Sequence, residues 1–158
     1  MRRQPLPLLT LDRHRALPWW PLVVFSLACQ PRAPARQPET VVLATDYAFQ
    51  VPHEIPAGVV VFRFENQGKV PHEMALGQLR AGVTADSMLA YIAQGNDPGD
   101  LSDGVVGILI AAPGKSSLGT LSVRLLSGRT YMMICQFTDA DSLPPHSAMG
   151  MQYSFVAQ

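Results

Sequence analysis

The chain has 158 residues, of which 47% are hydrophobic and 15% are charged, so it can bury one ordinary hydrophobic core but hardly two. Its twelve basic and twelve acidic residues cancel, and no run of Lys or Arg is interleaved with aromatic residues. This composition predicts one domain, which we expect to be a monomer, and it excludes nucleic acid as a favoured partner.

The N-terminal region differs in composition from the rest of the chain. Half of the fourteen prolines fall within the first forty residues, a density that is incompatible with a packed domain there. Arginines precede an apolar stretch from Ala16 to Leu27, which ends in Ala28 and Cys29. This order is typical of an export signal, and a stretch of about twelve residues is too short for the roughly 20 that a membrane-spanning helix needs. Residues 1–28 are therefore predicted to be a cleaved export signal.

The end of this signal resembles the lipobox of bacterial lipoproteins. Residues 25–29 read FSLAC, and in that family the cysteine is lipidated and becomes the new N-terminus. The resemblance implies that Cys29 carries a lipid anchor and that residues 29–38 form a polar, proline-rich tether. A plain signal peptide remains the alternative. With the anchor, we expect an exported protein of the cell envelope, held on the periplasmic side of a bacterial membrane.

From Glu39 onward the chain reads as short strands separated by turn residues. Val60, Phe62 and Phe64 alternate with polar residues, which is the period of a half-buried strand. Sequences rich in Gly, Pro and Asn lie between the apolar runs and indicate turns. Seven short strands in about 120 residues predict an all-β Greek-key β-sandwich that occupies residues 39–158. The expected strands are 40–45, 59–65, 70–76, 105–111, 118–125, 131–137 and 151–156.

One stretch has the period of a helix. Thr84 can cap a short helix over residues 85–94, which places Met88, Leu89 and Ile92 on one face. Gly95 follows and is expected to end it. The sandwich is therefore predicted to carry one short inserted helix.

Metal-binding residue types occur in two separate segments. His72 lies in the first, after a predicted strand and the turn Asn66-Gln67-Gly68. Cys135 ends a later strand and is followed by His146 and Met151. Because Cys29 is assigned to the signal or the lipid, Cys135 is left without a disulfide partner. Two imidazoles, one thiolate and a weak axial thioether form the ligand set of blue-copper electron-transfer sites.

Both segments resemble those of blue copper proteins, the plastocyanin and azurin families of cupredoxins. The likeness lies in the Asn, Gly and Pro-His pattern before residue 73 and in Tyr-x-x-x-Cys followed by a downstream His and Met. It implies a cupredoxin fold that holds one copper ion, with His72, Cys135 and His146 as equatorial ligands and Met151 as the axial ligand. Met149 is the competing axial candidate. The chain departs from the family in its longer loop after the cysteine and in Glu73, which replaces an Asn and so alters the link between the ligand loops.

Several alternatives accompany this interpretation. The same residues could form an ordinary core, which would make the protein a copper-free binding or structural lipoprotein of the same fold. We expect no catalysis. A nucleophilic pair of Cys135 and His146 would need an orienting third group and an oxyanion site, and no familiar protease context surrounds this cysteine. Asp139 and Asp141 read as a solvated acidic loop. His53 is interpreted as a surface residue, and Met132 and Met133 as core or sheet residues. The redox partner protein is unknown from the sequence.

Overall fold

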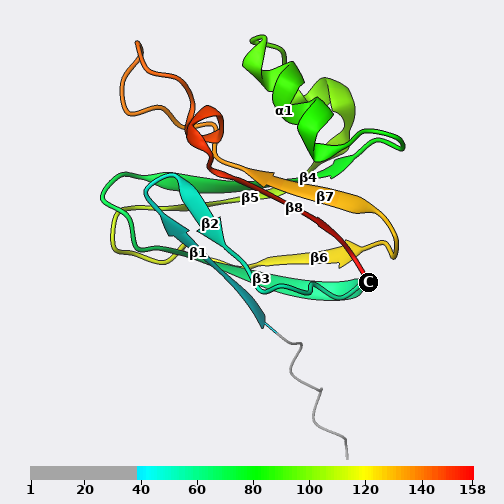
Figure 1. Cartoon of the computed structure of the whole chain (residues 1–158). Helices are drawn as coiled ribbons and strands as arrows, with labels where there is room; N and C mark the ends of the chain where they lie inside the picture. Colours follow the sequence, from blue (N-terminus) through cyan, green and yellow to red (C-terminus); the bar gives the residue numbers. More distant parts are fainter. Residues whose placement is uncertain (1–38) are drawn as a thin grey trace, which may run out of the picture. The chain divides into compact units, whose positions relative to one another are not determined.

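Two four-stranded sheets pack face to face in the computed structural model, which describes residues 39–158 (Figure 1). The first sheet has the order β2-β1-β3-β6 and the second has the order β5-β4-β7-β8. The predicted all-β sandwich is thereby confirmed. The strands are β1 Glu39–Thr45, β2 Ala48–Gln50, β3 Gly58–Asn66, β4 His72–Leu79, β5 Ser102–Ala111, β6 Leu121–Leu125, β7 Thr130–Ile134 and β8 Gln152–Val156.

The core lies between the two sheets and follows the alternation of the sequence. Val60, Phe62 and Phe64 of β3 are at most 1% exposed, whereas the residues between them are only partly buried. Tyr131 of β7 and Phe155 of β8 stack at a centroid distance of 5.6 Å on the opposite sheet. Burying one such side chain contributes about 1.5–3 kcal/mol, so we expect this core to stabilise the fold without help from a metal.

The inserted helix covers the outer face of the second sheet. Helix α1 spans Ala85–Ala93 and begins with a reciprocal capping box between Thr84 and Ser87. Its Met88 and Ile92 are buried in a second apolar cluster with Met132 and other side chains of that sheet. The helix is followed by Gly95, whose φ of 81° is the left-handed conformation that commonly terminates a helix. A single 3-10 turn, η1, follows at Pro98–Leu101.

Several strand ends differ from the expectation by two or three residues, in β4, β5, β6 and β7, and strand β2 was not predicted. Strand β2 is only 3 residues long and therefore lacks a clear alternation. Strand β7 ends at Ile134, not at residue 137, because the backbone of Cys135 leaves the sheet ladder to bond the loop that follows it. Strand β6 begins at Leu121, three residues later than predicted, after a loop that contains the fully exposed Leu118.

The predicted export signal, the lipid anchor at Cys29 and the tether lie outside the described residues. Among residues 39–158, no helix is both long enough and apolar enough to cross a membrane.

Candidate metal centre

Three metal-binding side chains meet at one end of the sandwich. His72 begins β4, Cys135 follows β7, and His146 begins the 3-10 turn η2, His146–Met149. Their ligand atoms lie within 4.8 Å of one another. Nδ1 of His72 lies 3.1 Å from Nδ1 of His146, and the sulfur of Cys135 lies 4.0 Å and 3.4 Å from these two nitrogens. The three side chains are 0%, 0% and 1% exposed, so the cluster is closed to water.

Neighbouring strands and a folded loop bring these residues together. Strands β4 and β7 are paired, with Ala75 opposite Ile134, which places the start of β4 beside the end of β7. The long loop after Cys135 then turns back on itself. Ser147 N–H donates to the carbonyl of Cys135 at 2.8 Å, and His146 N–H donates to the carbonyl of Phe137 at 2.8 Å. These bonds hold His146 next to the cysteine although ten residues separate them in the sequence.

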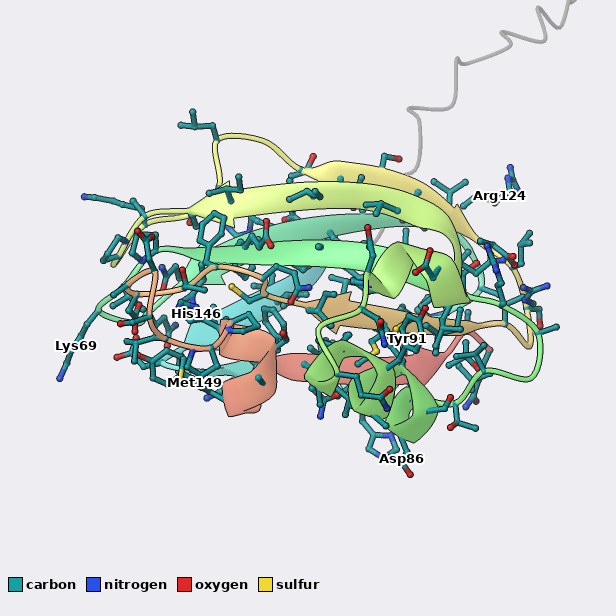
Figure 2. All side chains as sticks on the ribbon, turned by 90° about the horizontal axis from the view of Figure 1, so that it is seen from above. Lys69, Asp86, Tyr91, Arg124, His146 and Met149 are labelled. Atoms are coloured by element: carbon teal, nitrogen blue, oxygen red, sulfur yellow. The ribbon has the colours of Figure 1, made fainter. Side chains whose placement is uncertain are left out.

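Met151 lies in the same buried core as Cys135. It is 0% exposed, its carbonyl accepts the N–H of Cys135 at 3.2 Å, and its own N–H donates to the carbonyl of His146 at 2.9 Å. Met149 is only partly buried, and Figure 2 shows it near His146 at the end of the domain that also carries Lys69. The arrangement therefore favours Met151 over Met149 as a fourth donor.

The thiol of Cys135 sits in a dry environment. Burial raises its pKa, and hydrogen bonds from the backbone N–H groups of Glu73 and Phe137 offset part of this effect. The N–H of Glu73 lies 3.4 Å from the sulfur. The raised pKa favours the neutral thiol in the metal-free protein, and a bound cation would stabilise the thiolate.

Comparison with known proteins agrees with this architecture. No protein-family model and no curated protein matches the chain. Reduced auracyanin from the photosynthetic bacterium Roseiflexus castenholzii aligns at 16% identity over 76% of this chain and 96% of that chain, with a TM-score of 0.51. Auracyanin B aligns at 22% identity over 82% and 93%, also with a TM-score of 0.51. Auracyanin A, a "blue" copper protein from the green thermophilic photosynthetic bacterium Chloroflexus aurantiacus, aligns at 16% identity over 77% and 100%, with a TM-score of 0.48.

The described domain has the cupredoxin fold. The first two likenesses show this fold, and the donor cluster of the domain is of the type 1 composition, His-Cys-His with a buried Met. Soft sulfur suits Cu(I) and imidazole suits Cu(II), so the cluster supports one copper ion as the cofactor.

Glu73 preserves a link between the two ligand segments of the cupredoxin domain. Its side chain is buried, and its Oε1 accepts the N–H of Gln136 at 2.9 Å. Gln136 in turn accepts the hydroxyl of Ser147 at 2.6 Å. The carboxylate thus joins β4 to the residue that follows Cys135, and the link is made by Glu in place of the Asn that the resemblance led us to expect.

Sequence reasoning missed the residues that face the outer nitrogens of the two imidazoles. Nε2 of His146 lies 3.0 Å from Oδ1 of Asp139, and Nε2 of His72 lies 3.5 Å from Oδ1 of Asp46. The second contact is long and does not have the geometry of a formed hydrogen bond. Tyr47 donates its hydroxyl to Asp139 and packs its ring edge-on against His146 at a centroid distance of 4.9 Å.

One expectation is corrected by this arrangement. Asp139 is not a solvated loop residue, because it bonds both Tyr47 and His146, whereas Asp141 is exposed as predicted. His53 is exposed, and Met132 and Met133 are buried, as the sequence predicted. No short motif marks Asp46 or Tyr47, since the chain positions them only through the fold.

The donor set fits a metal ion better than it fits a purely protein interior. An Nε2 that donates to Asp139 leaves the lone pair of neutral His146 on Nδ1. That lone pair faces Nδ1 of His72 and the sulfur of Cys135, so three electron-pair donors converge. The pKa of His72 is lowered, chiefly by burial, which favours the neutral ring that a metal requires.

Proposed function

We propose that this protein binds one copper ion and uses it as a one-electron carrier. His72, Cys135 and His146 would be the equatorial ligands, and Met151 would be the weak axial ligand. The observation that carries this proposal is the convergence of two imidazole Nδ1 atoms and one sulfur within 4.8 Å of one another in a buried site. A bound copper would supply the Cu(I)/Cu(II) couple.

The residues of the chain supply a fixed and dry frame for that couple. His72 and Cys135 are anchored at the ends of paired strands, and His146 is held by backbone hydrogen bonds within the folded loop. Interiors packed in this way resist small displacements. A ligand set that cannot move much imposes one geometry on both oxidation states, which suits electron exchange and offers no open position for a substrate. A carrier, and not an enzyme, is the function that this site supports.

We further propose that the carrier is exported and anchored to the periplasmic side of a bacterial membrane through a lipid on Cys29. The support is the apolar stretch that ends at this cysteine and the proline-rich segment after it. A membrane anchor would confine the domain near membrane-bound redox partner proteins.

Copper titration followed by absorbance and stepwise reduction tests the carrier proposal. We expect one equivalent of Cu(II) to produce an intense thiolate-to-copper visible band, which one electron per protein bleaches and reoxidation restores. Cys135→Ser should remove the band, because the charge transfer needs the thiolate. His53→Gln is the matched control at an exposed histidine and should leave the band intact. A folded wild-type protein that takes up no copper would favour the copper-free binding module.

A further inference from the structure

Each imidazole of the metal cluster has a carboxylate at its far side. Asp139 lies 3.0 Å from Nε2 of His146, and Asp46 lies 3.5 Å from Nε2 of His72. The two carboxylates come from different loops, one between β7 and η2 and the other between β1 and β2. Both carboxylates lie on the side of each ring that faces away from Cys135. A metal could be bound by the two histidines and the cysteine without them, so their presence calls for a separate explanation.

The turn between β1 and β2 delivers one carboxylate and supports the other. Tyr47 has a φ of 67°, the one positive φ at a non-glycine residue among residues 39–158. Such a conformation costs about 1–3 kcal/mol and persists where the surrounding contacts over-determine it. Here the turn sends the hydroxyl of Tyr47 to Asp139, while Asp46 accepts the N–H of Lys69 at 2.7 Å. One strained turn is therefore connected to both histidines.

Contacts with neighbouring groups lower the pKa of both carboxylates. The hydrogen bond from Tyr47 holds the pKa of Asp139 below its usual value, and the contact with His146 lowers it further. The backbone N–H of Lys69 does the same for the pKa of Asp46, with a smaller contribution from His72. Two carboxylates thus lie directly behind the two imidazole rings.

We propose that Asp139 and Asp46 are positioning residues that orient the two histidines toward the metal and stabilise its more positive oxidation state. The proposal rests on the function proposed above. A carboxylate behind an imidazole fixes the hydrogen on Nε2, directs the Nδ1 lone pair inward and makes the ring a stronger donor. Negative charge beside the ligands also favours Cu(II) over Cu(I). Asp139 has the larger share, because its contact is shorter than that of Asp46.

The test compares Asp139→Asn with Asp141→Asn. Both changes remove one negative charge from the same loop, but Asp141 is exposed and makes no side-chain hydrogen bond or ion pair within the described part of the chain. The asparagine keeps the shape of the side chain and a carbonyl that can still accept from Nε2. Affinities for Cu(I) and Cu(II), measured by competition with chelators, and the reduction potential are the readouts. The melting temperature of the metal-free protein reports any structural damage separately.

We expect Asp139→Asn to weaken Cu(II) binding by about 10–100-fold and Cu(I) binding by less. The reduction potential should rise by about 59 mV for each factor of ten by which the loss of Cu(II) affinity exceeds the loss of Cu(I) affinity. Asp46→Asn should also weaken Cu(II) binding and raise the reduction potential, but by less than Asp139→Asn. Asp141→Asn should leave both near the wild-type values, because an exposed charge is screened by solvent.

Tyr47→Phe is the second variant, which keeps both carboxylates and the ring but removes the hydroxyl that holds Asp139. It should shift the potential in the same direction as Asp139→Asn, and it carries the test if that variant does not fold. Wild-type protein that binds copper while Asp139→Asn and Tyr47→Phe behave like Asp141→Asn would overturn this proposal alone. Wild-type protein that binds no copper would overturn the proposed function itself.

Discussion

Gly68→Ala places one methyl group against the carboxylate of Asp46. Gly68 lies in the loop between β3 and β4, and its φ is not in the left-handed region, so Ala adds bulk there without backbone strain. A Cβ at this position would lie 2.3 Å from Oδ1 of Asp46 and 3.0 Å from Nε2 of His72. The absence of a side chain at residue 68 is thus what allows Asp46 to approach the histidine.

The size of the effect follows from these distances. Ordinary contact with a Cβ begins at 3.4 Å, so Oδ1 must retreat by 3.4 − 2.3 = 1.1 Å. This movement breaks the 2.7 Å bond from the N–H of Lys69 and separates the carboxylate from His72. Overpacking costs about 1–3 kcal/mol, and we expect about 1 kcal/mol here, because a side chain that is 33% exposed can move toward solvent.

The assay is urea unfolding of the metal-free protein, together with Cu(II) affinity by chelator competition. Gly119→Ala is the matched control, since a Cβ there meets nothing within 4 Å and the φ is again ordinary. We expect Gly68→Ala to lower the free energy of unfolding and to weaken Cu(II) binding, whereas Gly119→Ala should do neither. If the two variants unfold alike and bind Cu(II) alike, Asp46 does not contact His72 in solution and the reasoning is refuted.

Three further predictions address the axial ligand, the pH response and the anchor. Met151→Leu should keep the copper and raise its reduction potential in voltammetry, because a weak axial thioether is a tuning ligand, while Met149→Leu should leave the potential nearly unchanged; the reverse pattern would reassign the ligand. The free energy of unfolding of the metal-free protein, measured in urea, should fall as the pH drops below about 6.5, because burial lowers the pKa of His72 in the folded protein and the unfolded chain takes up the proton first. His72→Gln should make the free energy of unfolding less dependent on pH, whereas His53→Gln should leave this dependence unchanged. If His72→Gln also leaves it unchanged, the assignment is wrong. Cys29→Ser should move the protein from the membrane fraction to the soluble fraction, and a wild-type protein that is already soluble with an unlipidated N-terminus would refute the anchor.

The fold and the inner part of the site follow from local patterns. The alternation of Val60, Phe62 and Phe64 predicts a strand with one buried face, and β3 has it. Thr84 and Gly95 likewise predict the ends of α1 closely, because capping depends on adjacent residues. These features could be predicted because the interactions that create them span only a few positions in the chain.

The outer part of the site could not be predicted because its contacts are distant in sequence. The hydroxyl of Tyr47 meets Asp139 across 92 positions. Asp46 meets His72 only because β1 and β3 are parallel neighbours and the loop that carries Gly68 folds over their ends. Strand β2, which makes the turn at Tyr47 possible, is too short to show a period. The pairing of strands and the closure of loops determine these positions, and both depend on residues that are far apart in the sequence.

The central claim is that a single copper ion is held by Cys135 and by Nδ1 of His72 and His146. Extended X-ray absorption fine structure at the copper K-edge, on protein loaded with one equivalent, tests this claim most directly. We expect one short copper–sulfur bond and two copper–imidazole bonds in both the Cu(II) and the Cu(I) forms, and the sulfur shell should vanish in Cys135→Ser. A copper environment of nitrogen and oxygen alone in the wild-type protein would contradict the account.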